Sequence, residues 1–164
     1  MTQTTSGTAT VTLPADNQIL ITREFNAPRH LVWRAYTTPD LVKRWWAGEK
    51  GTVTSAEIDL RVGGRWRYVM TANGGFEVAF HGEFRTIEEP GLLVNTEAYE
   101  GIPDPDGHAG LVTVTLTETD GRTHMEMLCE YNDKTDRDAV IESGMEGGMQ
   151  ESMDALEKVA VSLG

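Results

Sequence analysis

Apolar and polar residues alternate along most of the middle of the chain, which is the pattern of half-buried β-strands. One such segment is Ile19–Phe25, and six more follow after a gap. The six are Val53–Leu60, Gly64–Thr71, Gly75–Glu88, Leu92–Tyr99, Gly110–Thr119 and Thr123–Tyr131. Asn73-Gly74-Gly75 and Asp120-Gly121 mark two of the boundaries, and such residues favour the tight turns of hairpins. The pattern predicts an antiparallel sheet of about seven strands.

The last thirty residues change to a period of about 3.6, which predicts a long amphipathic C-terminal helix. Its apolar face carries Met145, Met149, Met153, Leu156, Ala160 and Leu163. Thr135 and Asp138 have the spacing of a capping pair near its start. Gly144, Gly147 and Gly148 each cost about 1 kcal/mol relative to Ala inside a helix. We therefore expect either that tertiary packing compensates or that the helix breaks near Gly144.

Two prolines punctuate the segment between the first strand and the other six. Pro28 and Pro39 suit the first turn of a helix, so two short helices are expected there. Three of the four tryptophans, Trp33, Trp45 and Trp46, also fall within this segment. The order is then one strand, two short helices, six strands and a long helix, which is an α+β arrangement.

Several motifs resemble the activator-of-heat-shock-protein-90-ATPase homologue family, within the polyketide cyclase and START-like lipid-transfer (SRPBCC) superfamily. They are Arg23-Glu24-Phe25-Asn26-Ala27-Pro28, Asp59-Leu60-Arg61-Val62-Gly63-Gly64-Arg65-Trp66, Phe80-His81-Gly82-Glu83-Phe84, and Ser143-Gly144-Met145-Glu146 running into Met153-Asp154-Ala155-Leu156. The resemblance spans about residues 18 to 163. It implies a helix-grip fold, in which a curved antiparallel sheet wraps around the C-terminal helix, the two short helices close one end, and a cavity typically remains inside.

Length and composition are those of a single domain, which we place at residues 17–164 after a flexible tail at residues 1–16. The tail lacks the basic start and apolar centre of a secretion signal. No apolar run approaches the roughly 18 residues that a membrane-spanning helix needs. The single cysteine, Cys129, excludes an intramolecular disulfide and fits a reducing compartment. We therefore expect a cytoplasmic protein without a membrane span.

The net charge of −12 is unevenly distributed along the chain. Residues 1–67 hold nine Lys and Arg against six Asp and Glu, whereas residues 68–164 hold five against twenty. So acidic a second half would repel a polyanion, and no basic patch interleaved with aromatic residues is present in it. Nucleic acid is thereby excluded as an expected partner.

Aromatic and sulfur-containing residues are the first candidates for a site. On Gly64–Thr71, alternation places Trp66, Tyr68 and Met70 on one face, which we expect to point inward. Such residues form either a plain core or the wall of an apolar pocket, where flexible Met side chains suit varied ligands. The pocket candidates are Trp45, Trp46, Trp66, Tyr68, Met70, Phe76, Phe80, Tyr99, Met145, Met149 and Met153.

His81 and Glu83 are polar candidates because they lie two apart on an expected strand and share a face. A carboxylate beside an imidazole could form an acid–base pair. The same alternation places Phe76, Val78, Phe80 and Phe84 on the other, more apolar face. The two polar side chains are therefore either cavity groups or surface groups.

No pattern predicts a metal, a cofactor or a nucleophile. Asp104, Asp106 and His108 alternate in a Gly- and Pro-rich loop but lack the further ligands of a calcium or zinc site. Histidines occur only at positions 30, 81, 108 and 124, without paired spacing. The chain has no Gly-x-Ser-x-Gly motif, and Cys129 has no evident activating neighbour. We expect no metal and no cofactor, and the catalytic residues, if any, are unknown.

Three functions follow from these observations. The first is the binding of a hydrophobic or aromatic small molecule, lipid-like or polyketide-like, between the sheet and the C-terminal helix. The second, implied by the resemblance, is a chaperone cofactor or other protein-interaction module. The third is a polyketide cyclase-like or hydratase-like enzyme that uses His81 or Glu83. The sequence leaves open whether any reaction is catalysed.

Overall fold

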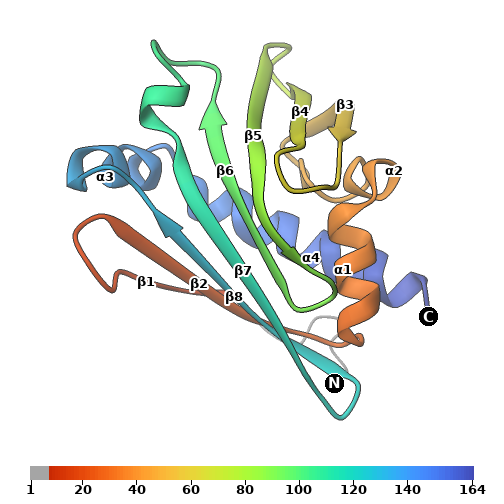
Figure 1. Ribbon diagram of the computed structural model, residues 1–164. Helices are drawn as coiled ribbons and strands as arrows, with labels where there is room; N and C mark the ends of the chain where they lie inside the picture. The colour runs from red at the N-terminus through yellow and green to blue at the C-terminus, as the bar shows by residue number, and fades with distance from the viewer. Residues whose placement is uncertain (1–7) are drawn as a thin grey trace.

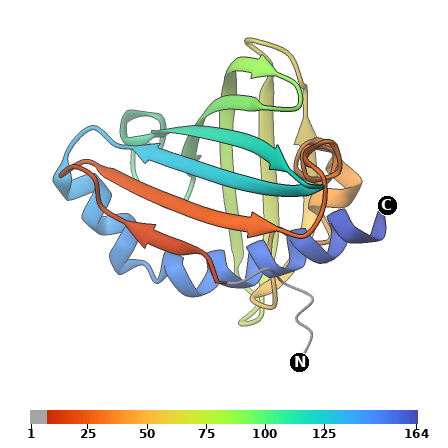
Figure 2. The same ribbon diagram turned by 90° about the horizontal axis from the view of Figure 1, so that it is seen from below.

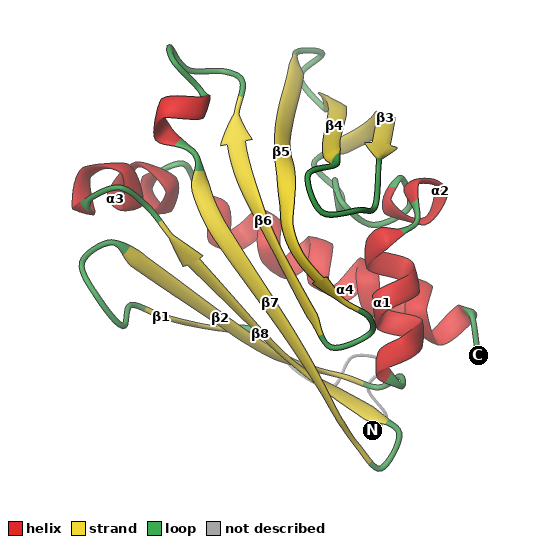
Figure 3. Ribbon diagram, in the orientation of Figure 1, coloured by secondary structure: helices red, strands yellow, loops and turns green. Residues whose placement is uncertain are grey.

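The computed structural model describes residues 8–164, which form one eight-stranded antiparallel sheet with helices on one face (Figure 3). The strands are β1 (Thr10–Thr12), β2 (Gln18–Phe25), β3 (Gly51–Ile58), β4 (Arg65–Ala72), β5 (Glu77–Glu88), β6 (Leu92–Tyr99), β7 (Gly110–Thr119) and β8 (Arg122–Glu130). The helices are α1 (Arg29–Thr37), α2 (Pro39–Val42), the 3₁₀ turn η1 (Asp106–His108), α3 (Lys134–Glu142) and α4 (Met145–Ser162). The strand order in the sheet is β1-β2-β8-β7-β6-β5-β4-β3.

The sheet is strongly twisted, and α4 lies along its inner face (Figures 1 and 2). Helix α1 packs against α4 at the end where the chain terminates (Figure 1). Leu156 and Ala160 of α4 are fully buried in the core between these layers. This arrangement confirms the predicted α+β helix-grip fold, including the two short helices after the first long strand. Within residues 8–164, no helix is both long enough and apolar enough to cross a membrane.

Alternation along β4 separates an apolar inner face from a charged outer face. Trp66 and Tyr68 are buried on the inner face, whereas Arg65 and Arg67 are exposed on the outer face. The register with β5 places Tyr68 opposite Phe80, so the apolar inner face and the charged outer face of β4 each extend onto β5. The two candidate sites suggested by the sequence therefore lie on opposite sides of the sheet.

The short strand β1 lies within the segment that we expected to be a tail. Thr10–Thr12 pairs with β2, and Val11 packs against the core. Two hydrogen bonds join Ala9 to Gln150 of α4. The Ala9 amide donates to Gln150 Oε1 (3.0 Å), and Gln150 Nε2 donates to the Ala9 carbonyl (2.8 Å). The alternating Thr and Val residues supply the β-propensity for this edge strand. Residues 1–7 of the expected tail lie outside the described residues.

The C-terminal helical region breaks at Gly144, one of the two outcomes expected from its glycines. Gly144 has a φ of 84°, a left-handed conformation that favours glycine, and it separates α3 from α4. The expected cap was wrong. Asp133, rather than Thr135, caps α3, because its side chain accepts the hydrogen bond from the Asp136 amide at 2.9 Å.

Candidate functional site

A cavity of about 50 Å³ lies between α1, the loop after α2, and strands β3, β4 and β6. Six aromatic side chains form most of its wall, and two polar side chains of β6 also line it, together with Thr37, Ile58 and Leu93. The aromatic residues are Tyr36, Trp45, Trp46, Trp66, Tyr68 and Phe84, and the polar residues of β6 are Asn95 and Glu97. The space is therefore an aromatic cavity with one carboxyl group.

The rings are held by contacts between elements. Trp45 donates its Nε1 proton to the Ala35 carbonyl (2.8 Å) and stacks on Tyr36, with ring centroids 5.4 Å apart. Trp66 donates from Nε1 to the Thr96 carbonyl on β6 (3.1 Å). Because buried indole N–H groups need an acceptor, these two bonds fix both indoles in place.

A row of rings leads from the cavity toward the surface. Trp46, which is half-buried and lines the cavity, makes an edge contact with Phe80 at 5.5 Å. Phe80 in turn lies 5.1 Å from Tyr99, which is 40% exposed. A continuous row of aromatic rings thus runs from the cavity to the exposed ring of Tyr99.

Of the described residues that line the cavity, Glu97 alone has an acidic side chain. It projects from the inner face of β6, as do Leu93, Asn95 and Tyr99 at alternate positions. Burial raises the pKa of its carboxyl to about 7. Burial also raises the pKa of Tyr36 and of Tyr68 well above the usual value, so both phenols stay protonated at neutral pH.

The structure brings together part of the set of aromatic and Met candidates. Trp45, Trp46, Trp66 and Tyr68 border the cavity, and Phe80 and Tyr99 continue from it. The remaining candidates do not border it: Met70, Phe76, Met145, Met149 and Met153. Met153 is buried in the core, Met145 and Met149 pack against that core, and Phe76 is 63% exposed. The cavity therefore lies beside α1 rather than beneath the Met stripe of α4.

Tyr36 and Glu97 were missed from the sequence. Period-two alternation along β6 contained the signal for Glu97, because it shares a face with the candidate Tyr99. Tyr36 lies on the expected first short helix, but only the packing of that helix on the tryptophan loop shows that its ring faces the cavity.

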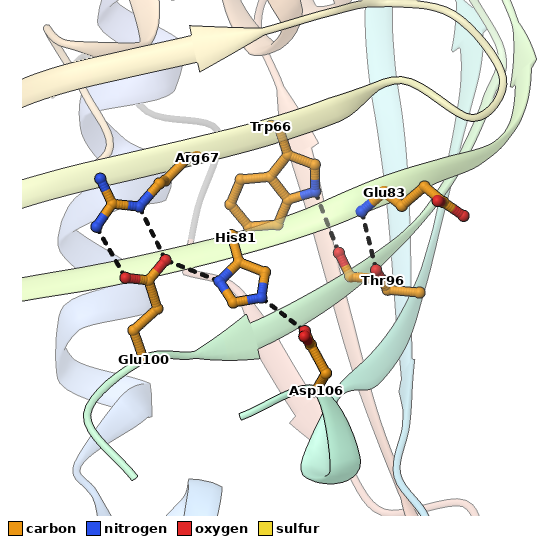
Figure 4. Close-up of polar contacts among 7 residues, drawn as sticks. All are labelled: Trp66, Arg67, His81, Glu83, Thr96, Glu100 and Asp106. Carbon is orange, nitrogen blue, oxygen red and sulfur yellow. Dashed lines mark hydrogen bonds and ion pairs between the residues drawn. The ribbon is translucent and has the colours of Figure 1, made fainter. Parts of the chain in front are cut away.

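His81 and Glu83 lie on the outer face and do not form an acid–base pair. Glu83 pairs with Arg85 instead, at 3.0 Å, and is half-exposed. His81 borders a wider groove of about 780 Å³ on this face, whose lining also includes Arg67, Glu100 and Asp106. Figure 4 shows this polar cluster in front of the strands.

His81 is held between two carboxylates. Its Nδ1 lies 2.7 Å from Glu100 Oε2, and its Nε2 lies 2.6 Å from Asp106 Oδ1 (Figure 4). Both ring nitrogens can donate at once only in the imidazolium form, so the two hydrogen bonds raise the pKa of His81. The bond with Asp106 has the larger effect, and the bond with Glu100 the smaller one. Arg67 makes two hydrogen bonds to Glu100 and, with His81, lowers the pKa of that carboxyl to about 2.

Asp106 and His108, which alternate in the loop after β6, contact separate partners. Asp106 contacts His81, whereas His108 contacts Asp136 of α3 at 3.0 Å. Within residues 8–164, no group of three His, Cys, Asp or Glu side chains has an arrangement that could hold a metal ion.

Comparison with known proteins places the chain in a family. The family described as activator of Hsp90 ATPase homolog 1-like protein matches residues 26–160. The chain belongs to this family. No curated protein matches it.

Solved structures of several bacterial proteins have the same fold as this chain. A Rhodobacter sphaeroides protein superimposes with a TM-score of 0.85 at 26% identity, covering 94% of this chain and 99% of the other. Protein Ms6760 of Mycobacterium smegmatis gives 0.83 at 25% identity over 93% and 96% of the two chains. An AHSA1-like protein of Aeromonas hydrophila gives 0.65 at 24% identity, over 88% and 93%. The helix-grip fold of the SRPBCC superfamily is common to all of them.

Proposed function

We propose that this domain binds a small molecule with an apolar or aromatic body on the inner face of its sheet. The observation that carries the proposal is the aromatic cavity, in which six rings surround a space next to a carboxyl group. Binding sites for small molecules are typically concave and mostly apolar, with a few polar groups that orient the ligand. The cavity has this composition.

The size of the cavity limits which part of a ligand it holds. A dry protein cavity of about 150 Å³ accommodates benzene. The space here is about 50 Å³, so it suits a head group rather than a ring. The body of the ligand would then lie along the row Trp46, Phe80 and Tyr99, which ends at the exposed ring of Tyr99.

A matched pair of substitutions tests this path. We expect Phe80→Ala to weaken the binding of an uncharged aryl alcohol such as 2-naphthaleneethanol by about tenfold, because one buried aromatic contact is lost. Phe76→Ala removes the same side chain from an exposed position and should leave the affinity unchanged. Tryptophan fluorescence titration measures both. Equal affinities of Phe80→Ala and the wild type would place the ligand elsewhere, and a lack of binding to the wild type would refute the proposal.

A chaperone cofactor is a second candidate, supported by the description of the family and by the charged groove on the outer face. The groove carries both signs of charge, as protein-interaction surfaces often do. Failure to co-purify with heat shock protein 90, together with unchanged ATPase activity of that chaperone, would remove this candidate. His81 and Glu83 lie on the outer face, away from the aromatic cavity, so we do not propose a cyclase or hydratase reaction that uses them.

A further inference from the structure

Glu97 has no polar partner for its carboxyl group within residues 8–164. Its backbone pairs with Gly110 of β7, but its side chain makes no hydrogen bond or ion pair with the described residues. The carboxyl borders the aromatic cavity, which explains why the residue is only half-buried by surface area. Burying a carboxylate without a donor is costly, so a ligand that brings a donor into the cavity removes that cost.

The remaining wall of the cavity favours a cation as that donor. The faces of Trp and Tyr rings attract positive charge, and five such rings surround the space. Among residues 8–164, no Lys, Arg or His side chain lines the cavity, so none of them competes for Glu97 there. The net charge of −12 also draws cations rather than anions toward the molecule.

We propose that the cavity takes the protonated amine of an amphiphilic or aromatic ligand, with Glu97 as its counter-ion. This inference rests on the proposed function, because it names the ligand class of the same site. The ammonium group would occupy the cavity, where it meets the Glu97 carboxylate and the indole and phenol rings. Its apolar body would extend along Phe80 toward Tyr99.

The pH dependence of amine binding follows from the groups that face Glu97. They are Tyr36 of α1, Tyr68 of β4, Cys129 of β8 and Tyr131, which follows the end of β8. Burial raises the pKa of each of these groups, and it raises that of Cys129 to about 12. All four stay neutral near pH 7, so Glu97 is the group that titrates there. Its carboxyl ionises as the pH rises through about 7, whereas an alkylamine stays protonated to about pH 10. Amine affinity should therefore rise between about pH 6 and pH 8.

Calorimetric titration with matched probes tests the inference. The probes are 2-phenylethylamine and 2-phenylethanol, which differ in the charged head and share the aromatic body. At about pH 8 we expect the wild type to prefer the amine by about tenfold, as for a charge-assisted hydrogen bond over a neutral one. Glu97→Gln keeps the size of the side chain and should abolish the preference. Glu77→Gln removes the same charge from an exposed position on β5 and should retain it.

The outcomes separate this inference from the function on which it rests. Equal affinity of the wild type for both probes, or an amine preference that survives in Glu97→Gln, would overturn the inference while the proposed function stands. If neither these probes nor the aryl alcohol bind to the wild type, both are refuted, and the cavity holds only water. The wild type supplies a test that needs no variant: amine affinity should increase about tenfold from about pH 6 to pH 8, whereas alcohol affinity stays constant. A flat amine profile would contradict the role of Glu97.

Discussion

Arg23 of β2 and Glu157 of α4 form an ion pair inside the core, with 3.2 Å between Arg23 Nη2 and Glu157 Oε1. Their side chains are 1% and 0% exposed, respectively. The second carboxylate oxygen of Glu157 accepts the Asn26 amide hydrogen bond at 2.6 Å, just after β2 ends. One carboxylate thus joins the long helix both to the sheet and to the start of the loop that leads into α1.

Removing the charge of Glu157 should destabilise the fold strongly. Glu157→Gln takes the charge of this carboxylate away from the buried Arg23 guanidinium, so we expect a loss of about 3 kcal/mol in the free energy of unfolding. Asp154→Asn is the control, because Asp154 also pairs with Arg23 but is half-exposed, and it should cost about 1 kcal/mol or less. Urea denaturation measures both. An equal effect of the two variants would contradict the dominance of the buried pair.

Two glycines near the start of α4 should respond in opposite directions to the same substitution. Gly147 lies within the helix, and a Cβ there would meet no other atom within 4 Å. Gly147→Ala should therefore stabilise the protein by about 0.5–1 kcal/mol, because helical glycine is entropically unfavourable. Gly144→Ala should destabilise it, since Gly144 adopts a φ of 84°. Thermal unfolding of the two variants gives the comparison, and a stabilised Gly144→Ala would mean that α3 and α4 can join.

The sequence predicted the architecture because periodicity and turn residues are local signals. The strands from β2 to β8, the two short helices and the break at Gly144 all follow from them. Local patterns did not reveal β1, since a three-residue strand resembles a polar tail until Gln150 and β2 are seen beside it.

The candidate site was predicted only in part, because a cavity wall is assembled from distant segments. Alternation identified Trp66 and Tyr68 correctly as inward-facing residues. The Met stripe of α4 was a misleading signal, since its central member Met153 fills the core. Glu97 escaped notice because an isolated glutamate on a strand usually faces solvent, and only the packing of Tyr36 and the tryptophan loop over it makes it an interior group.

The outer-face cluster predicts a histidine with a raised pKa that depends on one loop residue. The hydrogen bond with Asp106 is the main cause of the raised pKa of His81, so Asp106→Asn should lower that pKa toward 6.5. Asp104→Asn, in the same loop and without contact to His81, should leave it unchanged. Titration of the His81 ring protons by NMR measures the shift, and equal pKa values in the two variants would contradict the assignment.

The same cluster should attach the loop after β6 in a pH-dependent way. Folding raises the pKa of His81, so its contribution to stability is complete below about pH 6.5 and is lost as the pH rises through the folded value. Asp106 should then detach more readily from His81 once the pH exceeds the pKa of His81 in the folded protein. Above that pKa, hydrogen exchange of the Gly107 and His108 amides should accelerate by more than the intrinsic increase of amide exchange with pH. Exchange that follows only the intrinsic pH dependence would argue against such attachment.

The position of a bound ligand tests the central proposal most directly. Nuclear Overhauser contacts between 2-phenylethylamine and the isotope-labelled wild type, at about pH 8, report which side chains lie within about 5 Å of the probe. We predict contacts from its aromatic protons to the rings of Trp46 and Phe80, and from its methylene group next to nitrogen to the Glu97 side chain. Contacts confined to the outer groove at Arg67 and His81, or no contacts at saturating probe, would contradict the account.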